Sequence, residues 1–348
     1  IMIYAFHQYI RVIPYIIQRC ITENNQFDIT FVDGNFNNLL ENHCNKESII
    51  KMAEHALEKN MNITHQIMLH SNVDTDGTVK SDKKKDKLYK KIIKPYLDKK
   101  RNGDVQWVLT RVPSPDDEKT DGIPYKEYTQ LFFEMCDQPW DYIDTAQRAL
   151  IEELNTAKDI RFTNNDGTDI SMDLDGFTFA NSLLWRNIPG SEAFSAPRSD
   201  SPQGIIVAKG KYDPKDGVKK IFQNITMEFK SGKLINGSSE THNDYLQELL
   251  DEETGNRFIG ELGIGTNPHL KRSLMNTLLV EKTGGSFHVA LGNAYQMKKY
   301  KDEPVNVDNG NRSDLHWDIT TMLYGKEGTI EIDGRKIMQD GFFIDQDK

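Results

Sequence analysis

The pattern of expected secondary structure changes near residue 157 of the 348-residue chain, and this change constrains the fold most. In the first half, apolar residues at helical spacing alternate with short strand-like runs. The expected elements are strands at 27–33 and 105–112 and helices at 47–59, 80–100 and 142–157. Because strands that alternate with helices favour a parallel sheet, we predict an N-terminal α/β domain over residues 1–155. Its last helix would link it to the remaining chain.

The second half is rich in strands that are separated by Gly or Asp-Gly turns, a pattern typical of hairpins. Expected strands and turns cover 161–174, 203–212, 224–235 and 328–338, and a helix at 242–253 interrupts them. We therefore predict a β-rich mixed domain over residues 156–348 and expect it to carry the functional site. The fold class is α/β in the first domain and α+β overall.

Composition limits the partners and the compartment. A net charge of -10 argues against nucleic acid or a membrane surface as a partner. The three cysteines form no CxxC pair, which predicts reduced thiols in the cytoplasm and no disulfide framework or thiolate zinc cluster. No stretch approaches the ~20 apolar residues that span a bilayer.

The first residues of the chain are apolar but are interrupted by His7, Gln8 and Arg11. They lack the basic region and the small-residue cleavage site of a secretory leader. We interpret this stretch as a core element. Because the chain begins inside it, we expect the N-terminal domain to lack its true N-terminus.

Three segments resemble binding motifs only in part. The lysine run at 80–100 lies beside Asp82 and Asp86 and is typical of a solvated helix face. Residues 72–77 begin like a calcium loop, but Lys83 would occupy the place of its bidentate glutamate, so we predict a turn. The GxG of residues 260–268 lacks the third glycine of a dinucleotide loop.

The candidate site residues are His, Glu, Asp, Lys and Tyr side chains in four stretches of the β-rich half. A lone histidine on a strand is usually a hydrogen-bonded core or surface residue, and a glutamate beside a turn is usually solvated. The candidates are Glu192 in 188–197, Glu261 between a strand and a glycine-rich turn in 258–268, Glu281, Lys282, His288 and Tyr295 in 280–295, and His316 and Asp318 in 313–319.

Strand alternation gives two of these stretches a common geometry. Residues i and i+2 of a strand point to the same face, so His316 and Asp318 share one face and Trp317 packs on the other. His288 shares a face with Ala290, between apolar neighbours. The His242-Asn243-Asp244 run has the same spacing but begins a predicted helix, so we interpret that copy as structural.

Two imidazoles and several carboxylates form a set of nitrogen and oxygen ligands. Such a set suits Zn, Co or Mn, and carboxylate-rich versions are typical of hydrolases with paired metals. The residues alone leave open whether these side chains meet at a metal or serve the structure separately.

Four segments of the sequence resemble the thermophilic metallo-aminopeptidase family, the group of aminopeptidase T, aminopeptidase S and the PepS-type peptidases. They are GSEAFSAP, GELGIGTNP, EKTGGSFHVALGNAY and DLHWD, and they occur in the family's order and at similar separations. The resemblance is clear from about Arg161 to the end. In the first half it is limited to the α/β pattern and segments such as QWVLTRVPSP.

The resemblance implies a cytoplasmic homodimer that removes N-terminal residues from peptides with two divalent metal ions per subunit, drawn from Zn, Co, Mn and Mg. A narrow-specificity amidase or dipeptidase and a non-catalytic metal- or peptide-binding protein remain alternatives. Either Glu261 or Glu281 would be the water-activating base. The implied ligands are Glu192, Glu261 as the bridge, His288, His316 and Asp318; Tyr295 is implied to be catalytic, and Glu281 to be a ligand or an acid beside the ligands.

Overall fold

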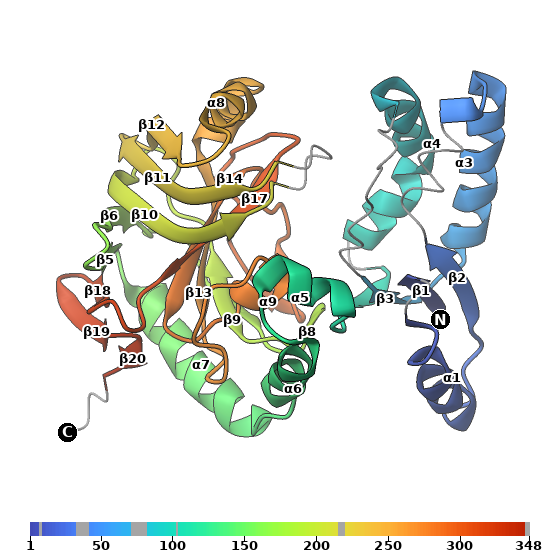
Figure 1. Ribbon diagram of the computed structural model, residues 1–348, viewed down its shortest axis with the longest axis horizontal. Helices are drawn as coiled ribbons and strands as arrows, with labels where there is room; N and C mark the ends of the chain where they lie inside the picture. Colours follow the sequence, from blue (N-terminus) through green and yellow to red (C-terminus); the bar gives the residue numbers. More distant parts are fainter. Residues whose placement is uncertain (7–8, 33–41, 71–81, 102–103, 215–219, 345–348) are drawn as a thin grey trace. The chain divides into compact units, whose positions relative to one another are not determined.

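The computed structural model describes residues 1–6, 9–32, 42–70, 82–101, 104–214 and 220–344 (Figure 1). The chain divides into two compact units. The first unit comprises Ile1–Gln130 and Arg186–Ile188, and the second comprises Leu131–Trp185 and Pro189–Lys348. The turn predicted at 72–77 lies outside the described residues.

The first unit is built on a parallel sheet, as the alternation of strands and helices predicts. Its strand order is β2-β1-β3-β4-β8, and every neighbouring pair is parallel. The strands are β1 (Met2–Phe6), β2 (Asp28–Val32), β3 (His65–Leu69), β4 (Gln106–Thr110) and β8 (Asn187–Ile188). The first residues of the chain are thus a strand of this sheet, which confirms the core element expected there.

Helices connect these strands. Asn45 caps α3 by accepting the N–H of Ser48 over 2.9 Å, and Ile49 and Ala53 form its buried face. In α4, Lys90 pairs with Asp86 on the helix surface, which agrees with the predicted solvated face. The helices are α1 (Ile13–Thr22), α3 (Lys46–Met61), α4 (Lys83–Arg101), α5 (Pro115–Asp121) and α6 (Tyr125–Cys136), the last of which continues into the second unit.

The second unit contains two larger antiparallel sheets. The eight-stranded sheet has the order β12 (Lys233–Ser239), β11 (Phe222–Lys230), β10 (Gln203–Tyr212), β6 (Asp169–Asp173), β5 (Asp159–Thr163), β18 (Thr329–Ile332), β19 (Arg335–Gln339) and β20 (Phe342–Phe343). The five-stranded antiparallel sheet has the order β17 (His316–Met322), β14 (Ser286–Gly292), β13 (Ile259–Gly265), β9 (Glu192–Ser195) and β7 (Ala180–Ser182). The predicted hairpins at 161–174, 224–235 and 328–338 all form in the first of these sheets.

The two antiparallel sheets share one hydrophobic core. Phe162 of β5 stacks on Phe287 of β14 with ring centroids 4.1 Å apart. Trp317 of β17 packs against Phe222 of β11, with 5.2 Å between centroids. One face of the five-stranded antiparallel sheet is therefore apolar, so strand alternation turns every second residue away from the core.

Helix α7 (Trp140–Thr156) covers part of the five-stranded antiparallel sheet by contacting β7 and β9 (Figure 1). It confirms the helix predicted at 142–157 and lies wholly in the second unit. A domain boundary after residue 155 stays a prediction. The remaining elements are α8 (Asn243–Asp251), the 3-10 helix η2 (Thr254–Arg257), α9 (Thr277–Val280) and the ribbon of β15 (Lys299–Tyr300) and β16 (Glu303–Pro304).

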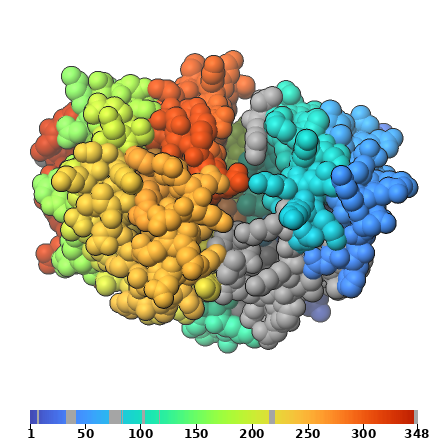
Figure 2. Space-filling model, turned by 90° about the horizontal axis from the view of Figure 1, so that it is seen from above, coloured from blue at the N-terminus to red at the C-terminus, as the bar shows by residue number. Residues whose placement is uncertain are grey.

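Helix α8 lies on the surface of the second unit, in the gold region of Figure 2. His242 precedes it with a φ of 54°, and both His242 and Asp244 are exposed. The second copy of the His-x-Asp spacing is thus placed at a helix start, apart from the strands. Among the described residues, no helix combines the length and apolar character needed to cross a bilayer.

Phe287→Ala should destabilise the second unit because it removes a fully buried ring from between its two sheets. Truncating a buried phenylalanine costs about 3–5 kcal/mol through lost burial and the cavity that remains. Urea denaturation measures the change, with Ile235→Ala, at a site that is 49% exposed, as the control. Equal losses in both variants would contradict the shared core.

Candidate functional site

Four neighbouring strands bring the candidate ligands to one face of the five-stranded antiparallel sheet. Their alternating neighbours, among them Leu262, Phe287 and Trp317, enter the core on the opposite face. The ligand face therefore faces away from the apolar core. The side chains are Glu192 on β9, Glu261 on β13, His288 on β14, and His316 and Asp318 on β17.

Small residues on this face make room for the larger polar ones. Ala290 is paired in register with Glu261 on one side and with Asp318 on the other. Gly263 is paired with His288, and a Cβ at Gly263 would lie 2.0 Å from Cε1 of the imidazole ring. Glycine at this position is thus required by the histidine on the next strand.

The sequence pattern predicted that Glu261 lies between a strand and a glycine-rich turn, and this prediction is wrong. Glu261 lies inside β13, which continues from Ile259 to Gly265. The glycines that suggested a turn are strand residues whose missing side chains give space to their neighbours: a Cβ at Gly265 would lie 2.2 Å from the carbonyl oxygen of Thr283. Glycine in a strand interior often marks such a close approach.

Glu261 lies between the two histidines. Its Oε1 is 3.7 Å from Nε2 of His288, and its Oε2 is 3.0 Å from Nε2 of His316. His288 Nε2 is also 3.8 Å from Oε2 of Glu192, and His316 Nε2 is 3.6 Å from Oδ1 of Asp318. One carboxylate therefore contacts both halves of the cluster.

The cluster divides into two groups of possible metal ligands. The first group is Glu192, Glu281 and His288, and the second is Glu261, His316 and Asp318. Within each group the ligand atoms lie within 4.8 Å of one another. Every ligand implied by the sequence resemblance is in one of the groups, and Glu281 joins the first.

Protonated histidines offset part of the negative charge of the buried carboxylates in this cluster. Burial alone would raise the pKa of Glu261, but the neighbouring imidazoles of His288 and His316 hold it at about 2. Burial would lower the pKa of both histidines, yet Glu261 and its neighbouring carboxylates raise it to about 9 for His288 and about 10 for His316. Both imidazoles are therefore protonated at neutral pH in the absence of a cation.

The residues fit a divalent cation. Oε2 of Glu192 and Nδ1 of His288 are buried without a hydrogen-bond partner among the described residues. Nδ1 of His316 lies 2.8 Å from the carbonyl oxygen of Asn293. When Nδ1 donates to that carbonyl, Nε2 is left as the ligand atom, the arrangement that orients histidines in metal sites. Carboxylate and imidazole ligands suit Zn, Mn or Co.

Lys282 is a member of the site to which the sequence assigned no role. It is completely buried, and its Nζ lies 2.6 Å from Oε1 of Glu192 and 2.7 Å from Oε1 of Glu281. A lysine beside a glutamate is typical of a solvated surface. The sequence feature that could have indicated a buried Lys282 is the apolar run of α9 just before the Glu281-Lys282 pair, because such a run is typical of a buried segment.

Tyr295 follows β14 and places its ring near the ligands. Its ring centroid is 5.2 Å from that of His316 and 5.4 Å from that of Phe194. Desolvation of the hydroxyl and the charges of Glu261 and Asp318 raise the pKa of Tyr295 well above its usual value of 10.0. The phenol is therefore protonated at neutral pH and available as a hydrogen-bond donor.

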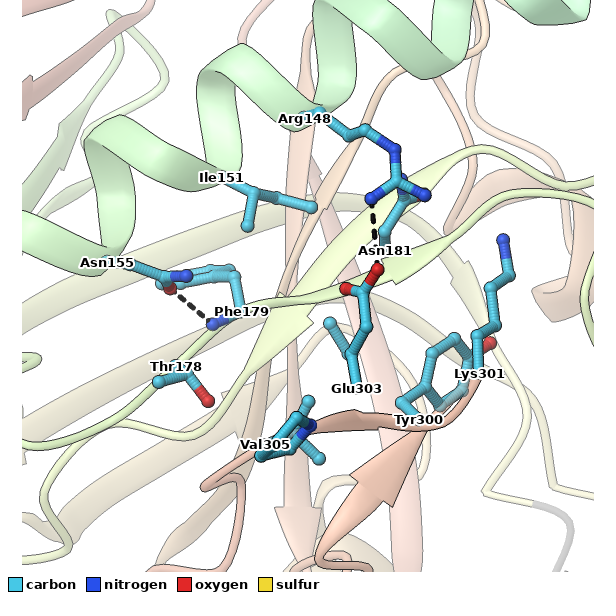
Figure 3. A pocket seen from close by; sticks show the side chains of 12 residues that line it. Arg148, Ile151, Asn155, Thr178, Phe179, Asn181, Tyr300, Lys301, Glu303 and Val305 are labelled. Atoms are coloured by element: carbon cyan, nitrogen blue, oxygen red, sulfur yellow. Dashed lines mark hydrogen bonds and ion pairs between the residues drawn. The ribbon is translucent and has the colours of Figure 1, made fainter.

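A separate small pocket of about 100 Å³ lies beside α7 in the second unit (Figure 3). Arg148 and Ile151 line it from the helix, and Tyr300, Lys301 and Glu303 line it from the β15–β16 ribbon. Arg148 and Glu303 pair across it at 3.2 Å. None of the candidate ligands lines this pocket, so it has no place in the chemistry of the cluster.

Lys282→Met should strongly destabilise the metal-free protein, because Glu192 and Glu281 would lose a shared, buried counter-ion. Breaking a buried ion pair by removing one partner costs about 3–5 kcal/mol. The matched control is Lys326→Met, which breaks a partly exposed pair with Asp166 and should cost at most about 1 kcal/mol. Urea denaturation with a chelator present measures both; a smaller loss for Lys282→Met than for the control would contradict this role.

The sequence matches the family model described as thermophilic metalloprotease (M29) over residues 22–343. Aminopeptidase AmpS of Bacillus subtilis (strain 168) is 28% identical over 154 residues, which cover 42% of this chain and 36% of that protein. Aminopeptidase T of Thermus aquaticus is 27% identical over 162 residues, 44% of this chain and 37% of that protein. The matched segments thus span little more than a third of these two relatives.

The structure is similar to that of wild-type AmpT from Thermus thermophilus, with a TM-score of 0.78 and 18% sequence identity. The superposition covers 99% of this chain and 93% of that one, so the two chains share a fold. The family model spans nearly the whole chain, including all four strands that carry the cluster. The chain therefore belongs to the M29 family of thermophilic metalloproteases.

Proposed function

We propose that the protein is a metal-dependent aminopeptidase that hydrolyses the N-terminal peptide bond of peptides at a site for two divalent metal ions. The observation that carries this proposal is the pair of three-residue ligand groups joined by Glu261. Membership of a metalloprotease family and the names of the aminopeptidase relatives support the same reaction class.

In this proposal Glu192 and His288 would hold one ion, His316 and Asp318 would hold the other, and Glu261 would be shared by both. The two oxygens of Glu261 face different histidines, which supports the bridging role. Glu281 belongs by distance to the first ligand group, but its Oε1 is bonded to Lys282. It would serve either as a ligand through its other oxygen or as an acid beside the ligands.

When bound, a pair of divalent ions lowers the pKa of a coordinated water and polarises the scissile carbonyl. The protonated phenol of Tyr295 would donate a hydrogen bond to the oxygen of the tetrahedral intermediate. Glu261 or Glu281 would accept the proton of the attacking water. Asn293 would keep the ring of His316 in the tautomer that ligates through Nε2.

Two alternatives are separated from this proposal by substrate choice. A narrow-specificity amidase or dipeptidase would use the same ligands, and a preference for an N-acetylated peptide over the same peptide with a free α-amine would contradict the aminopeptidase. A non-catalytic binding protein would hydrolyse no member of a peptide library with Zn²⁺, Co²⁺, Mn²⁺ or Mg²⁺. A cytoplasmic homodimer is also part of the proposal, and light scattering on the purified chain measures its mass in solution.

Glu261→Gln and His288→Ala should each lower kcat/KM on leucyl-p-nitroanilide at least about 100-fold, because each removes a proposed ligand. His242→Ala is the control, since it removes the histidine of the surface His-x-Asp run. Chelation should abolish the wild-type activity, and added Zn²⁺ or Co²⁺ should restore it. Parental rates in the folded, metal-supplemented ligand variants would contradict the proposal.

Metal binding should release protons and should become tighter as the pH rises. The pKa values of about 9 and about 10 for His288 and His316 keep both rings protonated below pH 9, and a metal ion binds only the neutral ring. Protons therefore compete with the ion at neutral pH, and this competition fades through the range of those pKa values.

Calorimetric titration with Zn²⁺ in two buffers of different protonation enthalpy should give about two protons released per chain at pH 7.5. The His288→Ala variant should release about one fewer. An apparent affinity that stays constant between pH 6.5 and 8.5 would contradict the assignment of these imidazoles as ligands.

A further inference from the structure

A glutamine stands in the middle of the buried face of α7. The other buried residues of this helix are Ile143, Leu150, Ile151 and Leu154, at helical spacing. Gln147 is 2% exposed among them. A buried side-chain amide is costly unless its donor and acceptor are both hydrogen-bonded. Its partners therefore indicate why the apolar stripe is interrupted here.

Both ends of the amide contact the chain around Glu192. Nε2 of Gln147 donates to the carbonyl oxygen of Glu192 over 2.7 Å and to Oδ1 of Asn181 over 3.0 Å. Oε1 accepts the hydroxyls of Thr266, over 2.6 Å, and Ser191, over 3.3 Å. One side chain thus joins the strand that carries Glu192 to the residue that follows β13.

Ser191 has a strained backbone directly before Glu192. Its φ is 119°, a region that residues other than glycine rarely occupy. It is completely buried, and its hydroxyl oxygen lies beside that of Thr266. Its N–H donates to the carbonyl of Ser182 over 3.2 Å, and its own carbonyl accepts the N–H of Thr266 over 3.1 Å. Such a conformation persists only where the surroundings fix it, and it is concentrated at functional sites.

We propose that Gln147 is a positioning residue for the metal site. It holds the hydroxyl of Ser191, whose backbone is strained, and the carbonyl of Glu192, so that the Glu192 carboxylate faces His288. This inference rests on the proposed function, since it concerns the ion that Glu192 and His288 would bind. Gln147 needs no contact with that ion, because it acts through the main chain of its ligand.

The same helix provides a matched control residue. Asn155 accepts the N–H of Phe179 over 2.7 Å through its side-chain oxygen, and it lines the pocket in Figure 3. It therefore also binds the main chain with a side-chain amide from α7. Phe179 precedes β7 and lies outside the strands that carry the ligands. A loss of Zn²⁺ affinity that occurs only when Gln147 is substituted would come from the position of Glu192. A loss that also occurs when Asn155 is substituted would come from disturbance of α7.

The test measures Zn²⁺ binding by equilibrium dialysis and elemental analysis on the full chain. Gln147→Ala should weaken one of the two Zn²⁺ sites about 10- to 100-fold, the range for residues that support metal ligands. Asn155→Ala should keep the wild-type affinity. With leucyl-p-nitroanilide, kcat of Gln147→Ala should fall at limiting Zn²⁺ and recover in excess Zn²⁺, while KM stays unchanged.

Ser191→Gly gives a rescue experiment, because glycine adopts a positive φ without strain. In the Gln147→Ala background it should restore most of the lost Zn²⁺ affinity. Circular dichroism and thermal unfolding check that each variant is folded. Gln147→Met, which keeps the length of the side chain, replaces the alanine variant if that variant is unfolded.

Wild-type Zn²⁺ affinity in a folded Gln147→Ala or Gln147→Met variant would overturn the inference, and so would an equal loss in Asn155→Ala. Failure of Ser191→Gly to restore affinity would overturn the part assigned to the strained backbone. A wild-type chain that binds no Zn²⁺ would overturn the proposed function and the inference together. Failure of the proposed function is thus seen in the wild type, whereas failure of the inference alone is seen only in the variants, so the two are distinguishable.

Discussion

The site depends on one constraint: the five-stranded antiparallel sheet must bury one of its faces against the eight-stranded sheet. The stacking of Phe162 on Phe287 and the burial of Trp317 fix which face is apolar. Because side chains alternate along a strand, the residues between them are forced to the other face. His288, His316 and Asp318 are there for this reason, and a shift of one residue in register would exchange the two sets.

Electrostatics then determines what this face can hold. Four carboxylates, from Glu192, Glu261, Glu281 and Asp318, lie close together with little access to water, and such a group is unstable without positive charge. Lys282 supplies one permanent charge, shared by Glu192 and Glu281. Two protonated imidazoles supply two more in the absence of a cation. The imidazole protons are replaceable and the lysine charge is not, so the cluster combines a fixed counter-ion with positions that a divalent ion can take.

Much of the fold could be predicted from local pattern. Helical spacing located α3, α4 and α7, and the glycine turns located the hairpins of the eight-stranded sheet. Glu261 was misplaced because glycines beside it resemble a turn, whereas Gly263 is a strand residue that yields space to a ring on the neighbouring strand. Lys282 was a candidate without a role and Gln147 was missed, since Glu192, which both contact, is distant from them in the sequence: Gln147 bonds to the carbonyl oxygen of Glu192, 45 residues away. Contacts of this kind depend on packing and leave little local pattern.

By itself, the sequence determined the types of candidate ligand, their order along the chain and the common face of His316 and Asp318, because strand periodicity is a local property. It also showed which family segments are present. Only the tertiary structure decided that β9, β13, β14 and β17 are neighbours, that Glu261 lies between both histidines, and that Lys282 and Gln147 contact Glu192. Pairing among these strands joins residues as distant in the sequence as Glu192 and Gly265, and it is set by the burial of the shared core rather than by any single segment.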